Sequence, residues 1–317
     1  MQRRAIHGVL LVDKPLTWTS NDALQKCKGL LGALKGGHTG TLDPLATGLL
    51  PLCFGAATKF SQASLDADKR YRATLHLGQR RVGGDLEGEV IEDRPVTCDA
   101  AAVREVLARF TGPLLQTPPM HSALKHQGRA LYEYARNGIE VPREPRPVVV
   151  HAIELIDWAL PLLVLDVRCS KGTYIRTLAE DIGTALGCGA HLAALRRTAC
   201  GPLGVADAIS IEAFEALSPE ARAKRLLPPE ALLADWPAIT LPAEEAARFL
   251  TGLRRRLDPA RHADAAQQRV HGPDGAFLGS AHITAGELIA DRLLSPDEVR
   301  ACAAPTPMPQ AAPGVPA

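Results

Sequence analysis

The chain has 317 residues, of which 46% are hydrophobic and 22% charged, with a formal net charge of +1. These proportions exclude disorder as the default, and the length suits one large domain and a smaller one. The balanced charge does not by itself indicate a nucleic-acid partner, whose phosphates favour a basic surface, so such a partner would require clustered lysines and arginines.

The cysteines give a first indication of the compartment. The seven are widely scattered and include no C-x-x-C pair or other zinc-like spacing, so we expect reduced thiols and no metal site. The apolar run over 9–12 is too brief for a signal sequence or a membrane span. The sequence therefore predicts a soluble cytoplasmic protein.

The long segment over 8–207 mixes strand and helix signals in an order that predicts a mixed sheet flanked by helices. Apolar and polar residues alternate from Tyr71, which is typical of a strand with one buried face. Helical spacing over 99–110 follows Asp99 as a predicted N-cap. Further elements are expected in chain order: a proline-rich and arginine-rich excursion over 117–146, a buried strand over 162–169 and a helix over 173–186.

The C-terminal part has a different residue pattern from the segment before it. Residues 210–230 have a helical, alanine-rich and glutamate-rich pattern, and short strands with a hairpin over 272–279 follow. We place a domain boundary near Trp236, with domains over 1–236 and 237–302. Residues 303–317 are mostly proline and alanine, and we expect them to form a disordered tail because they lack the apolar content that offsets ordering entropy.

The segment over 38–48 surrounds Asp43 with glycines, a proline and leucines. Pro44 biases Asp43 toward an extended backbone, and the leucines could hold the loop rigid. An aspartate in such a place is either a turn or helix cap or a reactive group. The local pattern leaves both interpretations open.

Two further segments place positive charge at the start of a predicted helix or strand. Lys171 and Arg176 flank the start of a predicted helix, where cations oppose the helix dipole and an anionic partner is favoured. That partner is either Asp43 or a phosphate, and the alternative is a solvent-facing arginine. Tyr71 stands between positive residues at the head of its strand, which suits either a stacked base or a core tyrosine.

The sequence lacks several familiar catalytic and nucleotide-binding motifs. It contains no nucleotide phosphate loop, no dinucleotide fingerprint, no H-E-x-x-H zinc motif and no G-x-S-x-G elbow. The natural enzyme class is therefore a carboxylate-based reaction that uses no cofactor.

Four motifs in this order and spacing resemble the TruB family of pseudouridine synthases: GVLLVDKP over 8–15, GHTGTLDPLATG over 37–48, KRY over 69–71 and KGTYIR over 171–176. The resemblance covers about 8–197, and beyond Trp236 it is a weaker likeness to a small PUA-like RNA-binding domain. It implies an α+β fold, with a central mixed, mainly antiparallel sheet flanked by helices and a small β-rich PUA-like C-terminal domain.

The resemblance also implies an activity. The family isomerises uridine 55 in the T loop of tRNA to pseudouridine after base flipping, through an aspartate nucleophile and without a cofactor or metal. A further role in tRNA folding is implied, as is a monomer that needs neither membrane nor protein partner. Non-catalytic RNA binding and glycoside hydrolysis are the rival functions. The hydrolase would need a second acid beside Asp43, where the alignment has Arg176.

Residue roles follow from the same resemblance. Asp43 corresponds to the catalytic aspartate, Arg176 to the arginine that pairs with it and Tyr71 to the tyrosine that contacts the target base. We favour Tyr71 as the acceptor of the C5 proton, and attack by Asp43 on the ring or on the sugar is left open. Four residues are expected to line the uridine site or support the catalytic loop: His38, Tyr174, Leu195 and Lys14. Eight cations are expected to contact RNA: Lys69, Arg70, Lys125, Arg129, Arg136, Arg143, Lys171 and Arg196.

The chain departs from the family pattern at one place near these motifs. Members usually carry a Thr-Asp-Thr-like run after the Gly-Gln-Arg of the strand, whereas here Arg81-Val-Gly-Gly84 follows and Asp85 remains. We expect this departure to alter local RNA contacts and not the chemistry. The excursion over 117–146 resembles the family's insertion that grips the T arm.

Overall fold

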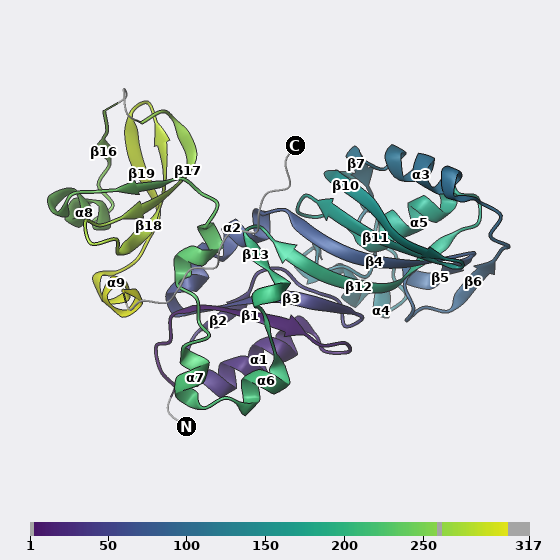
Figure 1. The fold of residues 1–317 in the computed structure, drawn as a ribbon, viewed down its shortest axis with the longest axis horizontal. Coiled ribbons are helices and arrows are strands. Elements are labelled where there is room, and N and C mark those ends of the chain that lie inside the picture. Colours follow the sequence, from purple (N-terminus) through teal and green to yellow (C-terminus); the bar gives the residue numbers. More distant parts are fainter. Residues whose placement is uncertain (1–2, 259–261, 304–317) are drawn as a thin grey trace. The chain divides into compact units, whose positions relative to one another are not determined.

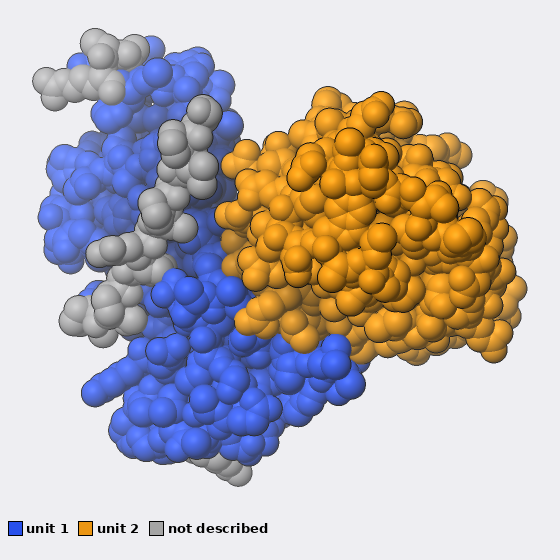
Figure 2. Space-filling model, turned by 45° about the vertical axis from the view of Figure 1, so that its right-hand side comes forward, with its two compact units in different colours: residues 1–40, 49–65, 201–317 blue, residues 41–48, 66–200 orange. Residues whose placement is uncertain are grey.

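The computed structural model describes residues 3–258 and 262–303 (Figure 1). The chain forms two compact units, which are coloured separately in Figure 2. Unit 1 contains residues 1–40, 49–65 and 201–317, and unit 2 contains 41–48 and 66–200. In the part of the chain that the structure describes, no helix is long and apolar enough to cross a membrane.

Unit 2 is built on an antiparallel sheet, in which each strand hydrogen-bonds to the next in the order given. The strands are β12 (Ala190–Cys200), β4 (Lys69–Leu77), β11 (Leu162–Cys169), β10 (Arg146–Ala159) and β7 (Gly112–Gln116). The first residues of β3 (Ala46–Phe54) add a parallel pairing to β12. The sheet is therefore mixed but mainly antiparallel, as predicted.

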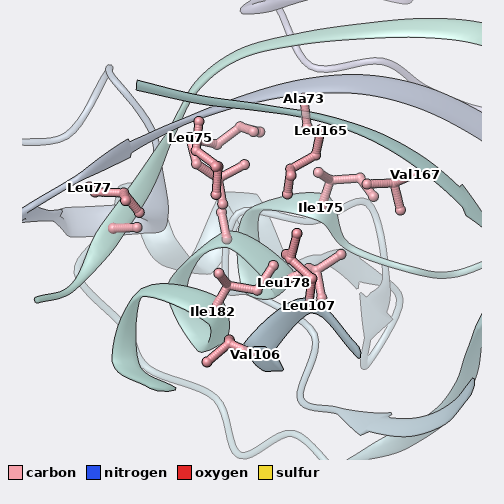
Figure 3. Packing of buried hydrophobic residues seen from close by; sticks show 14 of the residues in the cluster. Ala73, Leu75, Leu77, Val106, Leu107, Leu165, Val167, Ile175, Leu178 and Ile182 are labelled. Atoms are coloured by element: carbon pink, nitrogen blue, oxygen red, sulfur yellow. The ribbon is translucent and has the colours of Figure 1, made fainter. Parts of the chain in front are cut away.

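Two helices cover one face of this sheet. The helix α3 (Ala100–Arg109) is N-capped by Asp99, whose side chain accepts from Ala102 N, and α5 is Ile175–Ala185. Figure 3 shows Val106 and Leu107 of α3 and Leu178 and Ile182 of α5 packed with β4 and β11 side chains. Since alternate residues of β4 are buried, its inward face meets these helices, which confirms the predicted strand and both predicted helices.

Two smaller parts of unit 2 lie outside the main sheet. The first is a two-stranded sheet of β5 (Gln79–Arg81) and β6 (Val90–Asp93), joined through η2 (Val82–Gly84). The second is the predicted excursion, where β8 (Lys125–His126) and β9 (Arg129–Ala130) form a hairpin before α4 (Leu131–Arg136). The sequence of this excursion has one short helical pattern, at Leu131, Tyr134 and Ala135, which corresponds to α4.

Unit 1 contains a second apolar cluster. In it β1 (Gly8–Lys14) and residues 49–54 of β3 pack with α1 (Ser20–Leu31) and α6 (Ile211–Ala216). Beside them β14 (Ile209–Ser210) pairs with β1 and β2 (Gly36–His38) with β3. The remaining elements here are short: η1 (Gly55–Phe60), α2 (Ser61–Asp66), β13 (Leu203–Gly204), η3 (Val205–Asp207), α7 (Pro219–Ala223) and η4 (Pro229–Leu233).

The predicted helix over 210–230 is wrong as a continuous element. The chain forms α6, leaves the helical conformation at Leu217 and starts α7 with Ser218 as N-cap and Pro219 in the first turn. The residue before a proline avoids the α region, so a helix cannot run through Ser218. The sequence pattern thus corresponds to two short helices and not one.

The C-terminal part of unit 1 is β-rich, as expected. Five strands pair in the order β15 (Ala238–Thr240), β17 (Ala265–His271), β18 (Phe277–Thr284), β19 (Glu287–Leu293) and β16 (Arg255–Arg256). The helices α8 (Ala243–Leu250) and α9 (Pro296–Cys302) accompany them. The turn between β17 and β18 confirms the hairpin, while the tail expected over 303–317 lies, from 304 on, outside the described residues.

Candidate active site

Asp43 and Arg176 form an ion pair in unit 2, with Oδ2 of the acid 2.9 Å from Nη2 of the arginine. The Arg176 side chain is only 7% exposed, whereas that of Asp43 is 41% exposed. The turn after Asp43 is closed by its backbone carbonyl, which accepts from Ala46 N, so the carboxylate is not the group that closes it. A buried cation therefore holds a carboxylate that stays accessible to a reactant.

Arg176 is fixed by three further acceptors, which come from two segments of the chain. Its Nη1 lies 3.3 Å from Asp85 Oδ2 and 3.4 Å from the Gly83 carbonyl, and its Nη2 donates to the His121 carbonyl at 2.6 Å. A planar guanidinium can serve all these acceptors at once because its donors point in fixed directions. The alternative of a solvent-facing arginine is therefore wrong.

Asp85 belongs to the same network, although the sequence analysis assigned it no role. It is buried, shares Arg176 with Asp43, and its Oδ1 accepts from the Glu87 backbone N–H at 3.0 Å. The sequence showed that Asp85 remains although residues 81–84 depart from the family pattern. This observation does not tell whether Asp85 closes a turn or is the second anion beside Arg176.

Strand pairing places Leu195 and Arg197 beside the Asp43 loop. Leu195 of β12 lies opposite Ala46 on one side and Ala73 on the other, and Arg197 lies opposite Gly48 and Tyr71. Gly48 has φ +98°, and a Cβ there would lie 2.3 Å from the Arg197 carbonyl oxygen. Only glycine allows this close approach of the two strands.

Tyr71 contributes an aromatic ring next to this pairing. Its ring packs against the main core cluster, and burial raises the pKa of its hydroxyl to about 12. Arg197 is 1% exposed and hydrogen-bonds to Tyr71, and its positive charge lowers that pKa. Arg197 is a second residue the sequence analysis missed, although a charge within an apolar strand was a signal for it.

Tyr174 precedes α5 and is held by a buried amide. Gln116 accepts from Tyr174 N at 3.0 Å and donates to its carbonyl at 3.3 Å, which fixes the backbone at the start of the helix. Burial raises the pKa of the Tyr174 hydroxyl, and the nearby Ser122 side chain acts against this rise. Tyr174 and Arg176 are thus both positioned where the chain enters α5.

Lys14 and His38 belong to unit 1, whereas the residues described so far belong to unit 2. The Lys14 ammonium is fully buried and donates to the carbonyls of Pro15 at 2.9 Å and Trp18 at 2.6 Å. His38 lies in β2 opposite Leu52 of β3. Their predicted roles beside Asp43 stay predictions.

The cations expected to bind RNA differ in how available they are. Lys69 is buried, its Nζ donates to the Ala67 carbonyl at 2.7 Å, and burial lowers the pKa of its ammonium. Because its ammonium is turned to a carbonyl of its own chain, we leave Lys69 out of the proposed RNA contacts. Arg70 pairs with Asp166 and is partly exposed.

The remaining expected RNA contacts lie nearer to solvent. Lys171 forms an exposed pair with Asp66, and Arg143 donates to the carbonyl of Pro118. Arg196 is partly buried on β12. Three of the expected cations in the excursion are exposed: Lys125, Arg129 and Arg136.

Comparison with known proteins identifies relatives along most of the chain. Residues 28–175 match the family model of the TruB family pseudouridylate synthase N-terminal domain, 176–234 the tRNA pseudouridylate synthase B C-terminal domain and 237–294 the pseudouridine synthase II TruB C-terminal domain. A tRNA pseudouridine synthase B of Cupriavidus pinatubonensis is 56% identical, covering 93% of this chain and 96% of the relative. One of Burkholderia mallei is 54% identical over 93% and 99%.

Solved structures agree on the fold. A Cbf5-Nop10-Gar1 complex contains a chain that superposes with a TM-score of 0.71 at 24% identity, covering 92% of this chain and 87% of that one. An archaeal box H/ACA Nop10-Cbf5 complex gives a TM-score of 0.69 at 22% identity, covering 93% and 88%. With the family matches and the identity to curated relatives, the chain belongs to the TruB family of pseudouridine synthases.

Proposed function

We propose that the protein isomerises a uridine of the tRNA T loop, expected at position 55, to pseudouridine with Asp43 as nucleophile. The observation that carries this proposal is the accessible Asp43 carboxylate, held at 2.9 Å by the buried guanidinium of Arg176. Relatives more than half identical to the chain are named tRNA pseudouridine synthase B, which supports tRNA as the substrate.

The reaction breaks the bond from N1 to the ribose, turns the uracil and rejoins it through C5, with no redox change and no water consumed. Asp43 forms the transient covalent bond, either to the pyrimidine ring or to the sugar carbon. Arg176 holds the carboxylate in an attacking orientation, which removes much of the entropic cost of reaching that geometry. This chemistry needs neither cofactor nor metal.

The target uridine must leave its stack before Asp43 can reach it, at a cost of about a few kcal/mol. Stacking on Tyr71, which packs against the same core cluster as Leu195 and Leu45, offsets part of this cost. Tyr71 is also our candidate for accepting the C5 proton. Only the phenolate can accept this proton, so Tyr71 must first release its own proton; burial opposes that release, and the adjacent Arg197 favours it.

Glycoside hydrolysis would require a second acid that faces Asp43 as a proton donor. Asp85 is the nearest candidate in the network, but it is buried and engaged with Arg176 and the Glu87 backbone. The arrangement therefore favours a single nucleophile with an oriented partner, and not a pair of carboxylic acids.

RNA binding divides between two parts of the chain in this proposal. The excursion over 117–146, with its exposed cations, grips the T arm through phosphate contacts. Residues 1–236 act as the catalytic domain and 237–302 as a PUA-like RNA-binding domain; the start of a separate family match at 237 supports the position of the boundary. We further propose a cytoplasmic monomer that acts without a protein partner and assists tRNA folding.

The test is tritium release from T-arm RNA labelled at uridine C5. We expect Asp43→Asn to abolish release while RNA binding is retained, because the amide keeps the shape but is not a nucleophile. Asp99→Asn is the matched control, since Asp99 only caps α3 and asparagine caps equally well. Tritium release that persists in Asp43→Asn would refute the assignment.

A further inference from the structure

Glu180 lies on α5 one turn after Arg176, so the two side chains share a face of the helix. Its carboxylate packs directly against Gly84, which is buried and has φ +76°. A Cβ on Gly84 would lie 2.8 Å from Glu180 Cδ and 3.0 and 3.1 Å from its two carboxylate oxygens. The missing side chain at position 84 therefore leaves the space that the Glu180 carboxylate fills.

This contact is adjacent to the acceptors of Arg176. Gly83 supplies a carbonyl and Asp85 a carboxylate to the guanidinium, and Gly84 is the residue between them. Glu180 thus supports the middle of a segment whose two ends both hold Arg176. The same segment is where the sequence departs from the family pattern, at 81–84.

Burial of the Glu180 carboxylate lowers the stability of the folded protein. Within residues 3–258 and 262–303, this carboxylate has no hydrogen-bond or ion-pair partner, and burial is the main cause that raises its pKa. Arg80 and Arg176 face it with opposite charge, and Asp181 and Asp85 with like charge. A partly buried, unpaired carboxylate lowers stability, and such groups concentrate at functional sites.

We propose that Glu180 is a positioning residue of this active site. Its carboxylate packs against Gly84 and so sets where the Gly83 carbonyl and the Asp85 carboxylate meet Arg176. Glycine at position 84 leaves room for the Glu180 carboxylate, and a side chain at position 84 would require one of the two to shift. The inference rests on the proposed role of Arg176 in orienting Asp43.

The first test is Gly84→Ala, compared with Gly83→Ala. Both glycines have positive φ, at +76° and +80°, but a Cβ on Gly83 would meet only His121 at 3.6 Å. The effect of Gly83→Ala therefore measures backbone strain in this segment, including strain on the Gly83 carbonyl that Arg176 uses, without a clash with Glu180. We expect Gly84→Ala to lower kcat a further ~10-fold with little change in KM, because the new Cβ and the Glu180 carboxylate cannot both keep their places, and either shift changes how the 83–85 segment holds Arg176.

Rescue by a shorter acid decides whether Glu180 is the cause. Adding Glu180→Asp to Gly84→Ala withdraws the carboxylate by one methylene, and we expect kcat to return to the level of Gly83→Ala. The urea midpoints of the same variants form a double-mutant cycle, which should show coupling between positions 84 and 180. A double variant no better than Gly84→Ala in both readouts would overturn the proposal.

Substitutions of Glu180 by glutamine and by alanine separate the effect of its charge from the effect of its packing against Gly84. Because folding raises the carboxyl pKa, ionisation of Glu180 lowers stability as the pH rises through that pKa, and glutamine lacks this cost. We expect Glu180→Gln to be at least as stable as wild type at alkaline pH, with an advantage that shrinks on acidification. Because glutamine keeps the shape that packs against Gly84, the lower kcat is expected in Glu180→Ala, which removes that shape. An unchanged kcat in Glu180→Ala would contradict a positioning role.

The outcome for Glu180 can be separated from that for the proposed function. If Asp43→Asn retained tritium release, the nucleophile assignment would fail, while the stability cycle would still decide whether Glu180 and Gly84 are coupled. If Asp43→Asn were inactive but the cycle showed no coupling, only the inference about Glu180 would fall.

Discussion

Arg176→Lys is the substitution that tests the network most directly. Lysine keeps the positive charge but replaces a planar fork by one ammonium on a flexible stem. The guanidinium serves Asp43, Asp85 and two backbone carbonyls, and the ammonium cannot reach all four from one position. The substitution therefore removes the fixed donor geometry of the guanidinium and keeps its positive charge.

The size of the effect follows from the bonds lost. A hydrogen bond to a charged group contributes about 1.5–3 kcal/mol, and we expect at least one carboxylate of the pair to lose its partner. A loss of about 2–3 kcal/mol in the orientation of Asp43 corresponds to a kcat lower by about 30- to 160-fold. The free energy of unfolding should fall by a similar amount because Arg176 and Asp85 are both buried.

The assay is single-turnover tritium release from T-arm RNA, with urea denaturation in parallel. Arg222→Lys is the matched control, since Arg222 also donates to three backbone carbonyls but belongs to unit 1 and has no proposed role in the reaction. We expect the control to lose stability and keep its kcat. Turnover in Arg176→Lys within about threefold of wild type would refute the reasoning.

Three further predictions concern stability. Burial lowers the pKa of His191 from 6.5, so the urea midpoint should fall as the pH drops below that value, and His191→Gln should flatten this dependence. Gln116→Met should cost about 1–3 kcal/mol by leaving the Tyr174 backbone groups without their partner, as measured by urea denaturation; an unchanged midpoint would contradict the clamp. Thr19→Ala removes the capping box with Asp22 and should cost about 1 kcal/mol of stability, seen as a lower Tm with normal tritium release.

Local pattern was enough to locate most elements of unit 2. The alternation from Tyr71 corresponds to β4, and the helical spacing with Asp99 as N-cap corresponds to α3. Periodicity and capping are properties of neighbouring residues, so they can be read without knowing what packs against them. The same local reading was wrong over 210–230, where a proline divides the helix.

The sequence by itself determined the elements and, through the resemblance of its motifs, the family and the candidate roles of Asp43, Arg176 and Tyr71. Only the tertiary structure decided that Asp85 is the second anion on Arg176 and that Lys69 is turned inward. It likewise decided that Glu180 packs against Gly84. Alternation shows which face of a strand is buried, but not which distant segment it meets, since those contacts depend on strand register and packing between residues far apart in the chain.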